Sequence, residues 1–322
     1  IHAHTLNNPS QRISRTPNQP IGGLRLSCAL TLGRAGRAVA LLDTGAGRNR
    51  FAEKTQGFWT RDGTAPGELL TAAHSELGQY QSVTRIEVSA VSALGTLGDF
   101  TVSTNGDPAD VRTRRVVVAQ GVRDVLPDIP GFAENWGGSV FACPYCHGWE
   151  VRDRKLVMLG LTPLDYFHAE LLTQWSPSVT MIATDAAGDA TVHSELLSKA
   201  GVDVVHGKPV RITTGDNGCS GVVLADGHSI PADAIVVHPP LDYGSDIADD
   251  LGCVRLDDGA IDVTELGQSS VPGVSAAGDI ARRPNAPAGM HFIARAVADG
   301  MNVGAVLNQE LTFEDVQAKE LS

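Results

Sequence analysis

Hydrophobic positions along the chain alternate between short unbroken runs and runs with helical spacing. Residues 24–32 place apolar side chains three to four positions apart, as on one face of a helix, and the apolar run 38–42 predicts a strand. The same order returns later, with a strand at 155–159, a helix at 164–175 and a strand at 179–183. Alternating strands and helices are typical of parallel sheets covered by helices. The pattern therefore predicts an α/β fold with two such units.

Further apolar runs complete the two units. They predict strands at 86–91, 100–103, 115–119, 202–206, 210–213, 221–224, 234–238 and within 271–280, and helices at 66–80 and 291–311. Proline-rich stretches at 126–131 and 239–240 separate the units. We therefore expect boundaries near residues 121 and 241.

Residues 1–20 show neither the helical spacing of apolar residues nor an apolar run typical of a strand. They combine proline, Asn, Ser and Thr with no acidic residue, which predicts an irregular leader. A transit peptide would share the Arg and Ser content, but the segment lacks clear amphipathicity. The chain does not begin with Met, which indicates a truncated or altered terminus.

Composition limits the classes of partner. The 322 residues carry a net charge of -12, and no apolar run approaches the ~20 residues of a membrane span. This charge disfavours nucleic-acid and anionic-membrane surfaces and favours small molecules or neutral proteins. The five cysteines, an odd number, do not form the pattern of a disulfide scaffold. We therefore expect a reducing compartment, the cytoplasm, and one catalytic cysteine pair.

That pair is Cys143 and Cys146, with His147 directly after it. Two intervening residues allow one helical turn to bring the sulfurs within disulfide reach. A cysteine at a helix start faces unpaired N–H groups, which favour the reactive thiolate. His147, four residues after Cys143, would share its face and carry protons. The stretch predicts a redox pair.

Other interpretations of Cys-x-x-Cys-His are open. Half of a zinc site would need a second pair, whereas Cys28, Cys219 and Cys253 are scattered singly, so we expect no metal. The pattern also matches the attachment site of a c-type haem, although no secretory leader with an apolar core precedes it. Two buried thiols at this spacing by chance would not explain the adjacent His147.

Both expected nucleotide-binding turns depart from the glycine fingerprint. In the first, only Gly22 remains of G-x-G-x-x-G, and Arg25 stands where the third glycine belongs, either to meet a pyrophosphate or as an exposed side chain. Asp43, about 20 residues further on, is placed to hold an adenosine ribose hydroxyl. The second turn keeps Gly160 but has Asp165 where a small residue is expected, and no Arg or Lys precedes Lys199 after the next strand. This argues against NADPH, since its 2′-phosphate needs cations.

With these pieces in order, the chain from about Gly22 to its end resembles the low-molecular-weight thioredoxin reductase family of FAD enzymes. The resemblance implies two Rossmann-like three-layer domains, with a discontinuous FAD-binding domain (21–121 and 241–322), an inserted NAD(P)-type domain (122–240) and a homodimer. The motifs that carry it are 32–35 for the FAD helix, Asp43 for the ribose, Arg48 and Asn49 for an FAD-contacting loop, Ala119-Gln120-Gly121 for a strand end, the Cys143/Cys146 disulfide, and Ala277-Gly278-Asp279 for the ribitol.

One departure from the family's sequence pattern narrows the range of expected functions. His147 stands where the reductases have Asp, as in the branch that includes the dithiol oxidases of gliotoxin and holomycin biosynthesis. We therefore expect a FAD-dependent enzyme that oxidises a small dithiol, with oxygen as acceptor. One alternative is a thioredoxin-reductase-like enzyme fed by NAD(P)H, with a thioredoxin-like protein as partner. Another is a non-catalytic relative that has lost its FAD site.

Overall fold

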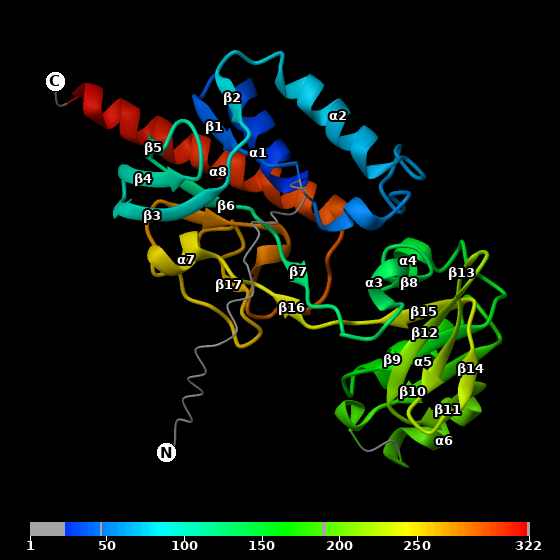
Figure 1. Ribbon diagram of the computed structural model, residues 1–322. Helices are drawn as coiled ribbons and strands as arrows, with labels where there is room; N and C mark the ends of the chain where they lie inside the picture. The colour runs from blue at the N-terminus through cyan, green and yellow to red at the C-terminus, as the bar shows by residue number, and fades with distance from the viewer. Residues whose placement is uncertain (1–22, 46, 189–190, 321–322) are drawn as a thin grey trace, which may run out of the picture.

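The computed structural model describes residues 23–45, 47–188 and 191–320. The predicted leader at 1–20 and Gly22 lie outside these ranges. The described chain forms two lobes (Figure 1). One contains the segments at both ends of the described sequence, and the other contains the middle segment. The fold is therefore α/β, with one domain interrupted by the other, as the sequence predicts.

The first lobe is organised around two helices that are far apart in sequence. Helix α1 (Gly23–Arg34) lies alongside the carboxyl-terminal helix α8 (Ile293–Glu320). Gly304 of α8 permits this approach, because a Cβ atom there would lie 2.9 Å from Thr31 Cβ and 3.1 Å from the Cys28 carbonyl oxygen. Across the contact, Ser27 Oγ donates a hydrogen bond to the Val297 carbonyl oxygen at 2.8 Å.

The strands of this lobe form small sheets. Strands β1 (Val39–Leu42) and β2 (Val83–Ile86) pair in parallel, as do β6 (Val116–Val118) and β18 (Val274–Ala276). The other elements of the lobe are α2 (Pro66–Leu77), the antiparallel sheet β3 (Ala90–Thr96), β4 (Asp99–Thr104) and β5 (Asp110–Thr113), α7 (Asp246–Asp250), and the pair β17 (Ile261–Asp262) and β19 (Ala281–Arg282).

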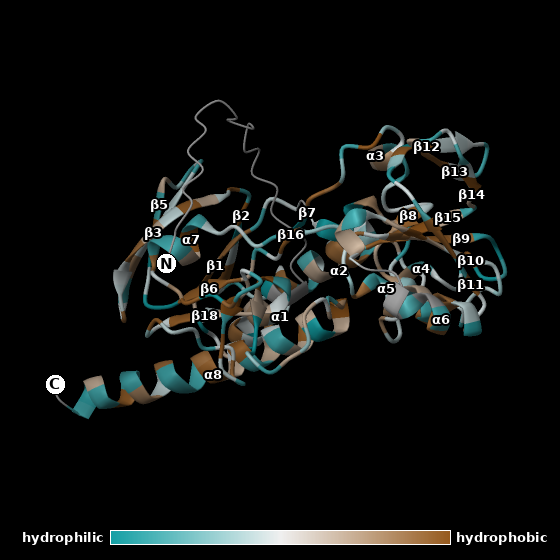
Figure 2. Ribbon diagram, turned by 90° about the horizontal axis from the view of Figure 1, so that it is seen from below, coloured by the Kyte–Doolittle hydropathy of each residue, from teal (hydrophilic) through white to brown (hydrophobic). Residues whose placement is uncertain are grey.

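The second lobe has three layers around a parallel sheet. Its strand order is β11-β10-β9-β15-β8, and every residue of the central strands β9 (Leu156–Gly160) and β15 (Ala234–Val237) is buried. Figure 2 shows hydrophobic colour on these strands. Helices α5 and α6 pack on one face, and a three-stranded antiparallel sheet packs on the other. The remaining bounds are α3 (Phe132–Asn135), β8 (Val140–Phe141), α4 (Pro144–His147), α5 (Asp165–Leu172), β10 (Val179–Ala183), α6 (Thr191–Lys199), β11 (Val202–His206), β12 (Pro209–Gly215), β13 (Gly218–Leu224) and β14 (Ser229–Pro231).

The chain passes between the lobes twice, at β7 (Arg123–Asp124) and β16 (Leu241–Asp242). The two segments lie side by side as an antiparallel pair, with Leu241 opposite Asp124. The proposed domain limits at 121 and 241 fall next to this pair and stay a prediction. No helix in the described ranges is long and apolar enough to cross a membrane.

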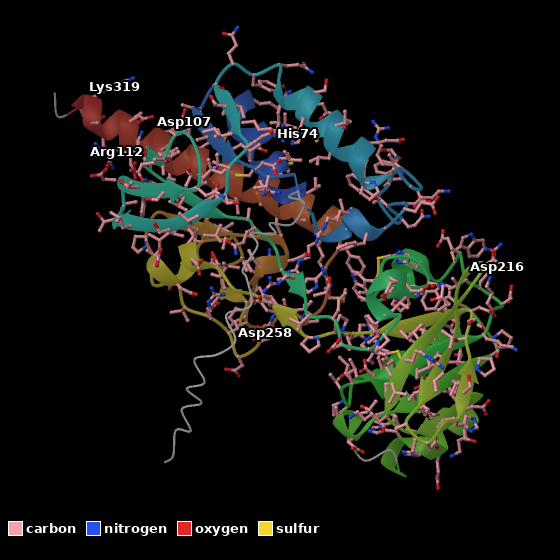
Figure 3. The ribbon with its side chains drawn as sticks, viewed as in Figure 1. His74, Asp107, Arg112, Asp216, Asp258 and Lys319 are labelled. Carbon is pink, nitrogen blue, oxygen red and sulfur yellow. A yellow bond between two sulfur atoms is a disulfide. The ribbon has the colours of Figure 1, made fainter. Side chains whose placement is uncertain are left out.

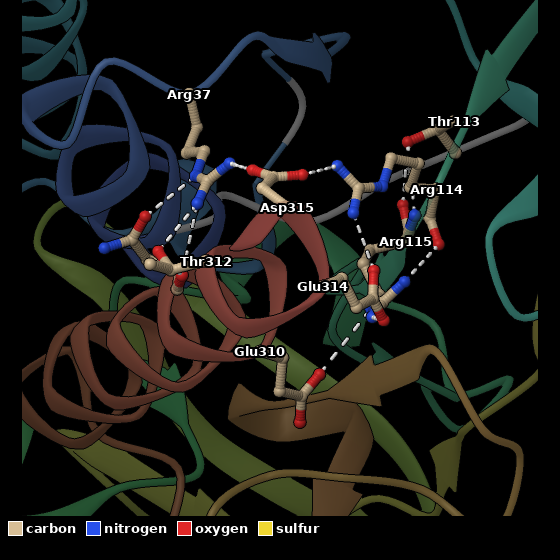
Figure 4. Close-up of polar contacts among 9 residues, drawn as sticks. Arg37, Thr113, Arg114, Arg115, Glu310, Thr312, Glu314 and Asp315 are labelled. Carbon is tan, nitrogen blue, oxygen red and sulfur yellow. Dashed lines mark hydrogen bonds and ion pairs between the residues drawn. The ribbon is translucent and has the colours of Figure 1, made fainter. Parts of the chain in front are cut away.

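Two predicted elements differ most clearly from the structure. The strand predicted at 86–91 is wrong, because β2 ends at Ile86 and β3 begins at Ala90. Helix α8 continues past the predicted end at 311 to Glu320. Its last turns are held by ion pairs that a periodicity argument does not count. Figure 4 shows these pairs, which join Asp315 to Arg37 and Arg114, Glu314 to Arg114 and Arg115, and Glu310 to Arg115.

Candidate active site

The Cys-x-x-Cys stretch forms a disulfide on a single helical turn. Cys143 and Cys146 are bonded, with their Cα atoms 5.2 Å apart. Cys143 is the N-cap of α4, and Pro144 suits the first helical position because it needs no N–H partner there. The Cys146 and His147 N–H groups donate to the Cys143 carbonyl oxygen at 3.1 and 3.2 Å. One turn carries only a small macrodipole, so the helix favours a thiolate less than a long helix would.

The other three cysteines are buried free thiols. Burial raises the pKa of Cys28 to about 12, and it also raises the pKa values of Cys219 and Cys253. A thiol held in its protonated form is a poor nucleophile. Among the five cysteines, thiol chemistry therefore belongs to the disulfide pair.

His147 lies within the turn, close to the disulfide. Its ring stacks on Phe141 with the ring centroids 4.8 Å apart. Its Nδ1 is buried and, within the described chain, has no hydrogen-bond partner. Burial lowers the pKa of His147 below its ordinary value, and the Glu150 charge opposes this shift. At neutral pH the imidazole is therefore neutral and able to accept a proton.

A cavity of about 830 Å³ faces the disulfide and His147. This volume lies near the upper end of the ~300–1,000 Å³ range for ligand sites. Both lobes contribute to its walls. The sequence-predicted residues that line it are Cys143, Cys146 and His147 from the second lobe and Arg48, Asn49, Ala119, Gly121, Gly278 and Asp279 from the first. The structure thus brings together nine side chains or backbone segments that the sequence singled out separately.

The predicted FAD-contacting residues form a polar wall of this cavity. Arg48 donates two hydrogen bonds to Asp124, at 2.8 and 2.7 Å, and its Nη1 lies 3.6 Å from Asp279 Oδ2. Burial opposes the charged form of Arg48, but Asp124 and Asp279 together raise its pKa. Sequence reasoning missed Asp124, since only the folded chain brings it to Arg48.

Two features of this wall fit a ligand with hydrogen-bond donors and acceptors, as FAD is. Asn49 lines the cavity, and its Oδ1 is buried without a protein partner among the described residues. Gly121 and Gly278 adopt φ angles of 72° and 71°, which only glycine adopts at little cost, and they leave backbone open to the cavity. The residues present therefore fit the flavin cofactor that the sequence predicts.

Aromatic side chains from both lobes also line this cavity. Tyr145 packs edge-on against Trp175 and against Phe292 of the first lobe, with centroids 5.4 and 6.5 Å apart. A further contact joins the two lobes, since Gln56 Nε2 of the first lobe donates a hydrogen bond to Glu150 Oε1 of the second at 2.8 Å. The sequence contained no signal for these contacts, because the aromatic residues stand singly and at no regular spacing.

Asp43 is fully buried and does not line the cavity. Its Oδ1 lies 2.8 Å from Arg25 Nη2 and accepts the Gly45 N–H at 2.9 Å. Its Oδ2 lies 3.0 Å from Nε2 of His74, labelled in Figure 3, and 3.8 Å from Arg85 Nε. Although burial opposes ionisation, Arg25 and these hydrogen bonds lower the pKa of Asp43. The interpretation of Arg25 as an exposed side chain is wrong, since it is only 7% exposed.

In the second of the two expected nucleotide-binding turns, a carboxylate of the protein itself binds the loop. Asp165 Oδ2 accepts hydrogen bonds from the N–H groups of Leu161 and Thr162, both at 2.8 Å, and from Thr162 Oγ at 3.2 Å. In a working dinucleotide site, such N–H groups at a helix start bind the pyrophosphate. Here a buried side chain occupies them.

Comparison with known proteins agrees with this architecture. Residues 22–300 match the family model described as pyridine nucleotide-disulphide oxidoreductase. Among curated proteins, the chain is similar to "Thioredoxin reductase sirT" of Leptosphaeria maculans, with 29% identity over 92% of this chain and 94% of that protein. Among solved structures, it resembles HlmI, with 37% identity, a TM-score of 0.83 and 93% of each chain covered.

An oxidoreductase from Agrobacterium tumefaciens is similar as well, with 34% identity, a TM-score of 0.82 and coverage of 91% of this chain and 97% of that one. The family model spans most of the chain, and membership of this family implies a flavin cofactor. The chain belongs to the pyridine nucleotide-disulphide oxidoreductase family and is a flavin-dependent, thioredoxin-reductase-like enzyme.

Proposed function

We propose that this protein oxidises a small dithiol through the Cys143–Cys146 disulfide, with FAD bound in the cavity and oxygen as the final acceptor. The observation that carries the proposal is the cavity itself. Its walls contain the disulfide and His147 together with Asn49, Gly278 and Asp279. A substrate that reaches the disulfide therefore enters the space in which the flavin-binding residues meet.

The chemistry follows from thiol–disulfide exchange. One substrate thiolate attacks the Cys143 sulfur, and the Cys143–Cys146 bond breaks to give a mixed disulfide. The second substrate thiol then attacks the substrate sulfur of that bond and leaves as a cyclic disulfide, so that both cysteines are reduced. His147 accepts a proton as each thiol ionises. Cys143 would be the exchanging thiol, and Cys146 would pass the electrons to the cofactor.

When bound, FAD supplies a two-electron acceptor for the reduced cysteine pair. Over one turnover, the dithiol loses two electrons and two protons, and one oxygen molecule gains them as hydrogen peroxide. The protein's own contribution is to hold the sulfurs in one turn, to keep the His147 imidazole neutral, and to orient the cofactor through Asn49 and the Gly278–Asp279 backbone.

Asp165 argues against a nicotinamide as electron donor. A dinucleotide would have to displace the carboxylate from the Leu161 and Thr162 N–H groups and would bring negative charge next to it. Charge-assisted hydrogen bonds contribute roughly 1.5–3 kcal/mol each, so displacement is costly. The names of the fungal relatives support the alternative, a reductase that takes electrons from NAD(P)H and passes them to a thioredoxin-like protein.

Anaerobic titration of the FAD-loaded protein separates the two directions. We expect a small dithiol to bleach the flavin, NADH and NADPH at millimolar levels to leave it oxidised, and readmitted oxygen to restore the colour and release peroxide. A Cys143→Ser/Cys146→Ser double variant is the matched control and should not bleach. Rapid bleaching by NADPH alone would establish the reductase. A purified protein that stays colourless after FAD addition would leave only the non-catalytic relative.

We also propose the domain limits 21–121 with 241–322 and 122–240, supported by the paired crossings β7 and β16. The resemblance to thioredoxin reductases further implies a homodimer. Light scattering on the purified FAD-loaded protein tests this, and a monomeric mass at micromolar concentration would contradict it.

A further inference from the structure

A second cluster of ionisable side chains lies in the inserted lobe, away from the disulfide. Asp165 and His168 stand one turn apart on α5, and His238 directly follows β15. Asp165 Oδ1 lies 2.8 Å from His238 Nδ1 and 3.5 Å from His168 Nδ1. The two imidazole rings are 4.1 Å apart, centroid to centroid. Three donor atoms from two elements thus converge within 4.8 Å of one another.

The Asp165 carboxylate of this cluster is held in one orientation by hydrogen bonds to its second oxygen. Its Oδ2 is held by the Leu161 and Thr162 N–H groups, so Oδ1 is turned toward the two histidines. Fixing a ligand carboxylate through hydrogen bonds to its other oxygen is how proteins commonly orient metal ligands.

His168 provides a second observation that points to a ligand. Its Nδ1 is buried, and within the described residues no hydrogen bond satisfies it. The His168 and His238 side chains are 21% and 29% exposed, whereas Asp165 is fully buried. The two imidazole rings are therefore partly exposed to solvent, while the carboxylate between them and the loop is enclosed by protein.

We propose that Asp165, His168 and His238 bind one divalent transition-metal ion of the zinc class. Imidazole nitrogen and carboxylate oxygen suit such ions, and three protein ligands with an open fourth position for water are a common tetrahedral arrangement. The ion would lie beside the ends of the neighbouring parallel strands β9 and β15, where a Rossmann unit otherwise receives a pyrophosphate. It would connect helix α5 to the segment that follows β15.

Calorimetry with Zn²⁺ on untagged, EDTA-treated, FAD-loaded protein tests the site. The disulfide is kept oxidised so that Cys143 and Cys146 offer no thiolates. We expect one ion per chain. His168→Ala and His238→Ala should each weaken binding by on the order of 100-fold or more. His228→Ala, an exposed histidine in the same lobe, should bind as the unaltered protein does. Absence of stoichiometric binding, or equal affinity in all three variants, would overturn the proposal.

X-ray absorption at the zinc edge identifies the ligands without any substitution. The proposed site predicts a first shell of nitrogen and oxygen only, at about 2.0–2.1 Å. Sulfur at about 2.3 Å would place the ion at cysteines and refute the assignment. If the three side chains only cap the helix and bind nothing, the calorimetric signal is absent, which is equally decisive. Neither result depends on the direction of electron flow, so the site can fail while the dithiol oxidase proposal stands.

Discussion

Replacing Arg25 by Met tests whether the buried ion pair between Arg25 and Asp43 stabilises the fold. The guanidinium and the carboxylate are 2.8 Å apart and only 7% and 0% exposed. Removing one partner of a buried ion pair costs about 3–5 kcal/mol, because the other charge stays buried. Asp43 would keep His74 at 3.0 Å and the Gly45 N–H at 2.9 Å. We therefore expect the lower end, about 3 kcal/mol, or a loss of roughly 5–10 °C in Tm.

The pH dependence of this loss has a definite sign. In the unaltered protein, burial opposes ionisation of Asp43, but Arg25 and its other partners lower its folded pKa. Ionised Asp43 therefore adds stability above the unfolded value of about 3.9, and this stability is lost as the pH falls through the lower folded pKa. In the variant, the Arg25 charge no longer lowers the folded pKa of Asp43, so burial opposes its ionised form more strongly than in the unaltered protein. The stability gap between the two proteins should shrink from pH 7 toward pH 4.

Urea unfolding followed by circular dichroism at pH 7 and pH 5 measures this gap, with and without FAD. Arg25→Lys should retain much of the stability because the charge remains. Arg112→Met, which removes an exposed partner of Asp99 (Figure 3), should leave Tm unchanged. A gap below about 1 kcal/mol at pH 7, or one that widens as the pH falls, would refute the reasoning. If Arg25→Met instead tightens FAD binding without loss of stability, Asp43 is a ligand for the cofactor ribose.

Three further outcomes follow from the site. His147→Ala should slow dithiol oxidation by ~10² and remove the acidic limb of the pH profile. We expect that limb below pH ~6.5, because burial lowers the pKa of His147. A change in rate of less than threefold would mean that His147 only packs against Phe141. Cys143→Ser and Cys146→Ser should give different flavin spectra, and identical spectra would contradict their separate roles. Asp124→Ala should cost about 1–3 kcal/mol in urea unfolding, because Arg48 loses two hydrogen bonds, and no loss would contradict this.

Most parallel strands of the second lobe could be predicted from the sequence. Predicted strands at 179–183 and 202–206 have the bounds of β10 and β11. Strands covered by other layers read as nearly continuous apolar runs with clear ends. The strand prediction for residues 86–91 failed because Val88 is buried although the chain there is irregular. The Ser89 N–H donates to the Asn105 side chain instead of to a neighbouring strand. Only tertiary contacts decide such a case.

The redox turn was predictable because its chemistry depends on residues adjacent in sequence. The polar wall was only partly predictable. Arg48 and Asp279 could be named from motifs, but Asp124, which orients Arg48, contacts it across 76 positions of the chain. Periodicity and motifs describe neighbours along the chain, so they cannot identify a partner chosen by the fold. The cluster of Asp165, His168 and His238 was missed for the same reason.

The departures from the glycine fingerprint gain a physical meaning in the structure. From the sequence, Asp165 is only an obstacle to a close approach of helix and strand. In the structure, its carboxylate accepts the loop N–H groups that a pyrophosphate would need, so the turn is satisfied by the protein itself. A nicotinamide would have to displace this carboxylate before gaining any contact of its own. A dithiol would not have to displace this carboxylate, because Cys143 and Cys146 line a different part of the protein, the cavity between the lobes. This difference in what must be displaced supports electron entry from the thiol side.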